Sequence, residues 1–449
     1  MNDLKRTDLS VQQERAILVA VITPERAGEA RNPLAELASL AATAGAIVVD
    51  GLIQRRSHIV AATYIGKGKV QEVRERAAAN NANLVIFNND LSPAQIRELE
   101  EATGCKVLDR SELILDIFAS RARTHEARLQ VELAQLQYTA PRLRGMWTHL
   151  ERIAGAGGGT GVGSVGGIGT RGPGERQIEI DRRIVRDRIS MLRHQIAEID
   201  QRKTREVLAR SDEFQVTLVG YTNSGKSTLM NALTGAGQLA EDKLFATLDT
   251  KTTRWQLGEA RTALLSDTVG FVRDLPHHLV ASFRATLEET IHANFLLHVV
   301  DAAAPEAGAQ IETVLKVLDE LGCHDTPKLT LFNKMDAAED LALIQVLEQR
   351  YVPSLRISAR SGAGLEHLIT AVIAAMRSAD VHATLRTSVR DGRLLAAIEQ
   401  KAHVLDRRFF DEQVEMDVRI NRTHLEQLLG RHPGLTVVKR GIDAPAGNV

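Results

Sequence analysis

Residues 214–235, FQVTLVGYTNSGKSTLMNALTG, limit most strongly what this chain can fold into. An apolar run typical of a buried strand leads into the spacing GxxxxGK[ST], and STLMNALTG then has the composition of a helix. Strand, glycine-rich turn and helix in this order form one βα unit of a largely parallel sheet covered by helices. Because the helix starts directly after the turn, its free N–H groups point at the turn and predict a phosphate site there.

Three further motifs follow predicted strands of the same region. TALLSDTVG ends in a DxxG motif, KLTLFNKMD ends in NKxD, and LRISAR supplies a serine and an alanine. Ligands of open α/β sheets bind at the carboxyl ends of the strands, so the four motifs predict one site. A carboxylate accepts hydrogen bonds from guanine N1–H and from its exocyclic amine, a donor pair that adenine lacks. The motifs therefore predict a guanine nucleotide and oppose an ATP-driven RNA remodeller.

The motifs assign roles to individual residues. Lys226 reaches the β- and γ-phosphate oxygens, Ser227 places its hydroxyl on Mg2+, and Asp267 bonds the Mg2+ shell through water. The amide of Gly270 senses the γ-phosphate, so Lys226 and Gly270 are predicted catalytic residues. The residues predicted from these motifs to bind GTP are Gly220, Tyr221, Thr222, Asn223, Ser224, Gly225, Lys226, Ser227, Asp267, Thr268, Val269, Gly270, Asn333, Lys334, Met335, Asp336, Ser358, Ala359 and Arg360.

A polar, threonine-rich stretch, DKLFATLDTKTTRW, lies between the first two motifs. A loop at this point should carry the threonine that closes over Mg2+ when GTP binds. Thr247, Thr250, Thr252 and Thr253 all fit this role on composition, and the residues alone do not choose among them.

A second glycine motif lies upstream, in GGGTGVGSVGGIGT, where Gly161, Gly163 and Gly166 spell GxGxxG. A dinucleotide-binding fingerprint must join a strand to a helix, and RIAGAGGGT before Gly161 is not a strand. Eleven of the 20 residues from 155 to 174 are glycine, so the spacing is expected by chance. We therefore expect a mobile loop, and a plain flexible linker is the alternative to a functional one.

The patterns divide the chain into four parts. Residues 1–118 form an N-terminal α/β domain, because short β-branched runs alternate with Ala/Glu/Arg-rich stretches. Residues 119–212 form an antiparallel helical hairpin with the glycine-rich loop at its tip, and its apolar seam comprises Leu129, Leu133, Leu136, Val185, Ile189, Leu192, Ile196 and Ile199. Residues 213–380 form the nucleotide-binding domain, and residues 381–449 form a small C-terminal α/β domain with a helix, the strand QVEMDVRI and another helix.

Charge and composition narrow the possible partners. The formal net charge of the chain is -1, yet residues 121–210 hold 17 lysines and arginines against 10 acidic residues, so the hairpin is the basic surface. Cys105 and Cys323 have no disulfide or zinc spacing. The N-terminus has no signal-peptide pattern and no apolar run reaches the ~20 residues that span a bilayer, so we expect a soluble cytoplasmic protein without stable membrane insertion. We also expect the protein to be a monomer.

The motifs GYTNSGKST, FATLD, DTVGFV, NKMD and SAR, preceded by a glycine-rich hairpin and an α/β domain, resemble the HflX family of ribosome-associated GTPases. The resemblance covers residues 15 to 375 and implies a Ras-like P-loop GTPase domain, a mixed sheet with helices on both faces. It also implies that Thr247 is the switch I threonine, a catalytic residue on Mg2+, and that Phe245, Ala246, Thr247, Leu248 and Asp249 lie against the nucleotide. The family often has proline after that aspartate, where this chain has Thr250, so the path of switch I beyond it stays open.

The resemblance implies GTP-dependent binding to the large ribosomal subunit and a role in splitting or rescuing stalled ribosomes under stress. The basic hairpin would then contact ribosomal RNA, with its tip directed toward the peptidyl-transferase region. The alternative function is a GTP-dependent switch that recruits a protein partner or assists RNA and ribosome maturation.

Two residues bear on the rate of hydrolysis. Phe271 follows DxxG, where a Ras-like GTPase has a glutamine that orients the attacking water, so intrinsic hydrolysis should be slow. Asn223 stands where related potassium-activated GTPases carry an asparagine that ligates K+. K+ is thus a candidate second cofactor beside Mg2+, and a purely conformational role of Asn223 in the turn is the alternative.

Overall fold

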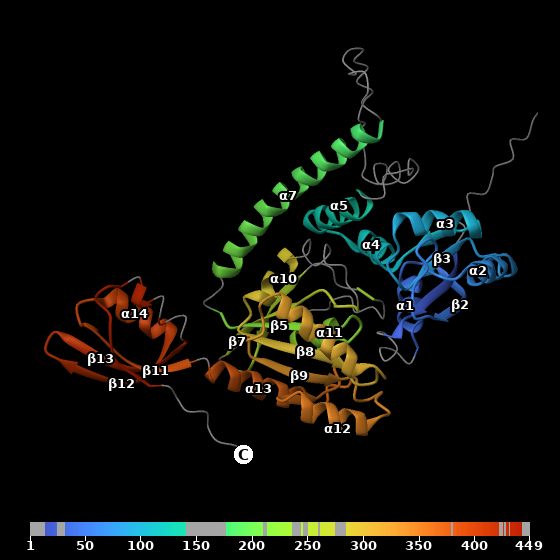
Figure 1. Cartoon of the computed structure of the whole chain (residues 1–449). Helices are drawn as coiled ribbons and strands as arrows, with labels where there is room; N and C mark the ends of the chain where they lie inside the picture. The colour runs from blue at the N-terminus through green and yellow to red at the C-terminus, as the bar shows by residue number, and fades with distance from the viewer. Residues whose placement is uncertain are drawn as a thin grey trace, which may run out of the picture.

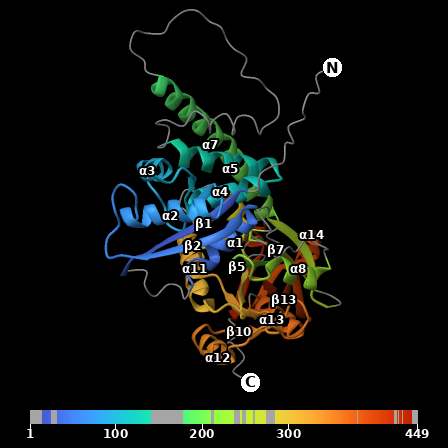
Figure 2. The ribbon, with the colours of Figure 1, turned by 90° about the vertical axis from the view of Figure 1, so that its right-hand side faces the viewer.

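The computed structural model describes residues 14–24, 32–140, 177–209, 213–235, 244–245, 250–258, 261–273, 284–378, 380–421, 425, 428–430 and 432–441. Within them lie three separate sheets, and Figure 1 shows the N-terminal and C-terminal sheets on opposite sides of the central one. Figure 2 looks along this row of domains from the N-terminal side. No helix in these ranges is long and apolar enough to cross a membrane.

The N-terminal domain is a parallel sheet with helices on both faces. Its strands, in the spatial order β2-β1-β3-β4, are β1 (Arg15–Ile22), β2 (Ile47–Arg55), β3 (Leu84–Phe87) and β4 (Lys106–Leu108). Its helices are α1 (Ala35–Thr43), α2 (Lys67–Ala79), α3 (Pro93–Thr103) and α4 (Arg110–Arg121). Along β1, Ala16 and Leu18 join one apolar cluster and Ile17 and Val19 join another. The uninterrupted apolar run of β1 follows from this burial on both faces.

The hairpin consists of α5 (His125–Thr139) and the much longer α7 (Gln177–Ala209). The predicted leucines of α5 pack against Val185, Leu192 and Ile196 of α7. Two ion pairs fix the antiparallel register, since Arg188 Nε lies 2.7 Å from Glu132 and Lys203 Nζ lies 2.6 Å from Glu126. The loop predicted at the tip, with Gly161, Gly163 and Gly166, lies outside the described residues.

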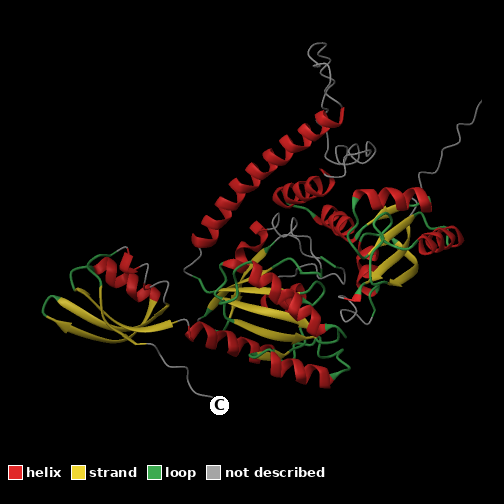
Figure 3. Cartoon of the chain, in the orientation of Figure 1, coloured by secondary structure: helices red, strands yellow, loops and turns green. Residues whose placement is uncertain are grey.

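The central sheet has the spatial order β10-β9-β8-β5-β7-β6, in which only β6 runs antiparallel to its neighbour. The strands are β5 (Gln215–Gly220), β6 (Lys251–Gln256), β7 (Thr262–Asp267), β8 (Phe295–Asp301), β9 (Lys328–Asn333) and β10 (Ser354–Arg356). The helices are α8 (Lys226–Thr234), α10 (Arg284–Ile291), α11 (Ala307–Glu320), α12 (Leu341–Arg350) and α13 (Leu365–Ser378). The predicted mixed sheet with helices on both faces is confirmed (Figure 3).

The C-terminal domain is an antiparallel sheet of order β12-β13-β11-β14. It comprises β11 (Asp380–Ser388), α14 (Gly392–Lys401), β12 (Ala402–Phe410), β13 (Gln413–Asn421) and β14 (Thr436–Gly441). The sequence predicted β13 alone among these strands, from the alternation in QVEMDVRI, and it missed β11, although Val381, Ala383 and Leu385 of β11 alternate with polar residues and join the same apolar cluster as β13. The edge strand β12 is mostly exposed, so it carries no such alternation.

Candidate functional site

The P-loop joins β5 to α8, and its two outer glycines are required by close contacts. A Cβ on Gly220 would lie 2.3 Å from the Val299 carbonyl oxygen. A Cβ on Gly225 would lie 2.4 Å from Asn333 Nδ2, and its φ of +93° is left-handed. Asn223 also adopts a positive φ of 59°, a conformation that asparagine tolerates better than most residues. The motif spacing is thus enforced by backbone geometry.

Lys226 begins α8 with its side chain buried under the loop. Its Nζ donates hydrogen bonds to the carbonyl oxygens of Gly220 at 3.1 Å and Tyr221 at 3.0 Å. Burial lowers the pKa of Lys226 to about 8, and the Asp267 carboxylate opposes this shift. The ammonium therefore lies inside the loop, where the predicted phosphate group belongs.

The oxygens predicted to hold Mg2+ meet at the start of α8. Ser227 Oγ donates a 2.6 Å hydrogen bond to Asp267 Oδ2, and the Asp267 side chain is fully buried at the end of β7. A hydroxyl and a carboxylate are hard oxygen donors, and Mg2+ is held by one or two such groups together with substrate phosphates and water. Among the described residues no cluster of three or more His, Cys, Asp or Glu could hold a metal. This pair therefore fits a nucleotide-bound Mg2+ and no all-protein metal site.

The NKxD motif joins three loops. Buried Asn333 donates from Nδ2 to the Ser224 carbonyl at 2.9 Å and accepts from the Ala359 amide at 2.9 Å. Asp336 is exposed, and Ser358 Oγ donates to its Oδ1 at 2.6 Å. This hydrogen bond is the main cause of a lowered pKa of Asp336. The carboxylate is therefore held ionised and oriented, as an acceptor for paired N–H donors must be.

The threonines predicted as candidates for closing over Mg2+ lie in different parts of the structure. Thr252 and Thr253 lie in β6, and Thr252 Oγ1 is bonded to Ser266 Oγ at 2.9 Å, so both threonines belong to a strand and not to the predicted loop. Ala246 to Asp249, with Thr247, lie outside the described residues, and Thr250 directly precedes β6. Phe245 is buried with a φ of 55°, and its amide donates to Thr222 Oγ1 at 2.9 Å.

The DxxG segment is packed against the P-loop. The Phe271 amide donates to the Gly220 carbonyl at 3.1 Å, and the Thr222 amide donates to the Phe271 carbonyl at 2.7 Å. Thr268 Oγ1 is bonded to the Leu218 carbonyl at 2.7 Å, below the site. The Phe271 side chain is buried in the same apolar cluster as α4 of the N-terminal domain, so it presents no polar group to an attacking water.

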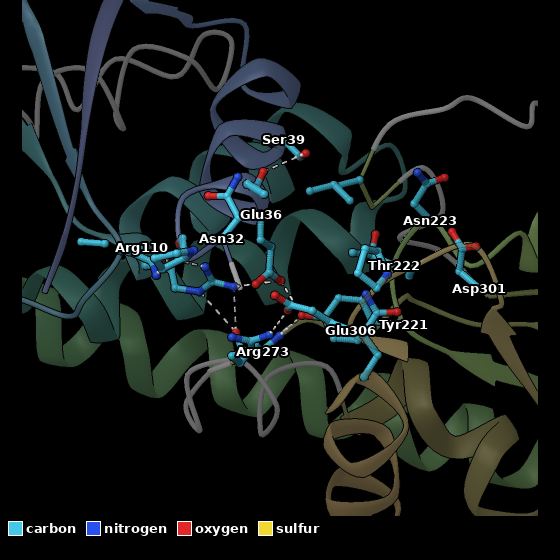
Figure 4. Close-up of a pocket in the computed structure, with 18 of the residues that line it drawn as sticks. Asn32, Glu36, Ser39, Arg110, Tyr221, Thr222, Asn223, Arg273, Asp301 and Glu306 are labelled. Atoms are coloured by element: carbon cyan, nitrogen blue, oxygen red, sulfur yellow. Dashed lines mark hydrogen bonds and ion pairs between the residues drawn. The ribbon is translucent and has the colours of Figure 1, made fainter. Parts of the chain in front are cut away.

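Sequence reasoning missed the contribution of the N-terminal domain. The Phe245 ring meets the Phe118 ring of α4 edge-on, with ring centroids 4.6 Å apart. A cavity of about 320 Å³ lies between the two domains beside the P-loop, and Figure 4 shows Glu36, Arg110 and Arg273 around it. Nothing local in the sequence signals these contacts, because their partners are more than 100 residues apart.

Comparisons with known proteins cover most of the chain. Residues 31–119 match a family model described as GTP-binding GTPase N-terminal, residues 121–210 match its middle region, and residues 215–334 match 50S ribosome-binding GTPase. The protein GTPase HflX of Magnetococcus marinus is 42% identical over 96% of this chain and 98% of that relative. GTPase HflX of Escherichia coli is 40% identical over 94% of this chain and 97% of that relative.

Among solved structures, the chain is similar to a GTP-binding protein from the hyperthermophilic archaeon Sulfolobus solfataricus in complex with GDP. The identity is 25%, the TM-score is 0.41, and the match covers 81% of this chain and 98% of that one.

Proposed function

The chain belongs to the HflX family of GTPases and hydrolyses GTP, and from this premise we propose that it acts on the large ribosomal subunit. In this proposal GTP-dependent binding splits or rescues stalled ribosomes under stress, in the cytoplasm. The observation that carries it is the basic hairpin, in which residues 121–210 hold 17 lysines and arginines against 10 acidic residues while the whole chain is close to neutral. Such local positive charge suits the phosphate backbone of ribosomal RNA.

In this proposal, different residues of the nucleotide site contact the phosphates, Mg2+ and the base. Lys226 would neutralise the β- and γ-phosphates from inside the loop, while Ser227 would hold Mg2+ directly and Asp267 would hold it through water. When bound, Mg2+ supplies positive charge between the phosphates. Thr247 would close over the same ion, and the Gly270 amide would contact the γ-phosphate. The remaining residues predicted from the motifs orient the nucleotide, with Asp336 reading guanine.

Slow intrinsic hydrolysis follows from Phe271, because its buried ring cannot orient water. We expect the ribosome to stimulate the reaction, and K+ to assist it through Asn223. Asn223→Gly is the matched test, since glycine keeps the left-handed φ and removes only the amide side chain. Turnover in K+ should exceed turnover in Na+ for the wild type and lose this preference in Asn223→Gly. Equal wild-type turnover in the two salts would restrict Asn223 to shaping the turn.

Ribosome binding is tested by pelleting the protein with large subunits in the presence of a non-hydrolysable GTP analogue, GDP or no nucleotide. We expect the GTP analogue to give the strongest binding. Arg193→Glu, on the exposed face of α7, should weaken it, whereas Arg377→Glu on α13 makes the same charge change away from the hairpin and should not. No nucleotide-dependent binding would favour the alternative switch that recruits a protein or assists RNA maturation.

The glycine-rich tip is tested by replacing residues 157–170 with a short serine-rich turn. Folding and GTP affinity should stay intact, because a glycine-rich segment contributes almost no buried side-chain area. Ribosome binding or ribosome-stimulated hydrolysis should fall. If the ribosome stimulates GTP hydrolysis by this variant as much as by the wild type at moderate salt, where phosphate contacts still contribute, the tip only connects the two helices.

A further inference from the structure

Arg273 lies three residues after Gly270, the last residue of the DxxG motif, and both its amide and its carbonyl are bonded to distant parts of the chain. Its amide donates to the Tyr221 hydroxyl of the P-loop at 2.7 Å. Its carbonyl accepts from Arg110 Nε at 3.3 Å and Nη2 at 3.1 Å. Figure 4 shows these groups converging between the two domains. Arg273 is thus attached to the nucleotide loop on one side and to the N-terminal domain on the other.

Glu36 of α1 completes the connection. Its carboxylate accepts a hydrogen bond from the Tyr221 hydroxyl and lies 3.0 Å from Arg110 Nη2. The Arg110 side chain is only 3% exposed, and Asn88 Oδ1 accepts from its Nη1 at 2.8 Å, so the guanidinium has one fixed position. Burial beside the Glu36 carboxylate raises the pKa of Tyr221, so its hydroxyl stays protonated and bridges the two domains.

Residues 270–273 pack against P-loop groups that would contact the γ-phosphate of GTP. The Thr222 amide is engaged by the Phe271 carbonyl at 2.7 Å. A Cβ on Gly270 would lie 2.7 Å from Thr222 Cα and 3.0 Å from Lys226 Nζ, so the Gly270 backbone packs directly on the loop. A γ-phosphate between Lys226 and the Gly270 amide requires this packing to open. A diphosphate ends at the β-phosphate and places no group there.

We propose that Arg110 and Glu36 are positioning residues that bias the nucleotide site toward GDP over GTP. They hold Arg273, Arg273 holds the Phe271 bridge to the P-loop, and GTP must displace that bridge while GDP need not. A ligand shifts a two-state equilibrium only by its differential affinity for the two states. Contacts that stabilise the state in which Phe271 is bonded to the P-loop therefore lower the affinity for GTP and leave the affinity for GDP unchanged. The proposal concerns the GTPase site itself and does not depend on ribosome binding.

The test is the ratio of dissociation constants for GDP and a non-hydrolysable GTP analogue. Arg110→Ala should shift this ratio toward the GTP analogue by about tenfold, the equivalent of ~1.4 kcal/mol, with GDP affinity unchanged. Tyr221→Phe keeps the buried ring and removes only the bridging hydroxyl, so it should shift the ratio in the same direction even if Arg110→Ala folds poorly. Arg76→Ala is the control, because Arg76 pairs with Asp50 and Glu72 within the same domain.

Amide hydrogen exchange gives a second readout that a merely structural role would not move. In the wild type, the Thr222 and Arg273 amides should exchange faster with the GTP analogue than with GDP, and Tyr221→Phe should reduce that difference. An unchanged affinity ratio in Tyr221→Phe, or parallel loss of both affinities, would overturn the proposal. Failure to bind ribosomes would refute the proposed function and leave this ratio unaffected.

Discussion

Asn333 gives the sharpest test of how the nucleotide site is assembled. Its side chain is 1% exposed and bonds the Ser224 carbonyl of the P-loop and the Ala359 amide of the loop after β10, each at 2.9 Å. Asn333→Ala removes both hydrogen bonds at once and leaves the Ser224 carbonyl and the Ala359 amide without their partner. An unsatisfied buried backbone group costs about 1–3 kcal/mol, so two such groups cost about 2–6 kcal/mol.

This cost should appear in nucleotide affinity, in stability or in both. If the loops separate in the free variant, water satisfies the two groups, and binding must bring them together again. A loss of 2 kcal/mol in affinity is about thirtyfold in the dissociation constant for GDP. If the loops stay together, the same cost lowers the apparent melting temperature instead. Both quantities are therefore measured on the same preparation, by competition with a fluorescent GDP analogue and by thermal unfolding.

Two variants calibrate the result. Asn333→Asp has nearly the same shape and still accepts from Ala359, but it places a carboxylate oxygen against the Ser224 carbonyl, so it should also weaken binding. Asn80→Ala removes a 2.9 Å side-chain bond to the Arg76 carbonyl in the N-terminal domain and should leave GDP affinity unchanged. GDP affinity within twofold of wild type in Asn333→Ala, together with an unchanged melting temperature, would refute the reasoning.

The remaining predictions concern base choice and pH. Asp336→Asn should move preference from guanine toward xanthine nucleotides, whose base offers an acceptor where guanine offers a donor, and equal affinity of the wild type for ATP and GTP would contradict guanine reading. Because burial lowers the pKa of Lys226 to about 8, GDP affinity should fall about tenfold between pH 7 and 9, and a flat titration would exclude control by this ammonium. Burial lowers the pKa of His298 in β8 from 6.5 to about 3. Folding with neutral His298 therefore costs no stability above pH 6.5, but the free energy of unfolding falls by roughly 4 to 5 kcal/mol as the pH is lowered from 6.5 toward 3. The melting temperature should fall more steeply with decreasing pH in the wild type than in His298→Leu, and parallel pH dependences would contradict this prediction.

The sequence alone determined the fold class and the GTPase activity, and it predicted the residues of the nucleotide site. Each of its four motifs combines an apolar strand with polar residues at the next turn, and both features are local, so they can be read within about ten residues. The order of the motifs then predicts one sheet edge, because parallel strands place their carboxyl ends together. The same local reasoning failed in the C-terminal domain, where an exposed strand such as β12 has no periodic pattern.

Only the tertiary structure decided how the site is connected. It placed Thr252 in a strand and gave Asn333 a role in joining two loops, neither of which follows from the motif letters. It also brought Arg110 to Arg273 across 163 residues and Glu36 to Tyr221 across 185. The physical reason is that local propensity and hydrophobic period record only which face of an element is buried. Which distant side chains meet depends on how whole domains pack, and a buried ion pair such as Arg110–Glu36 has no periodic signature in the sequence.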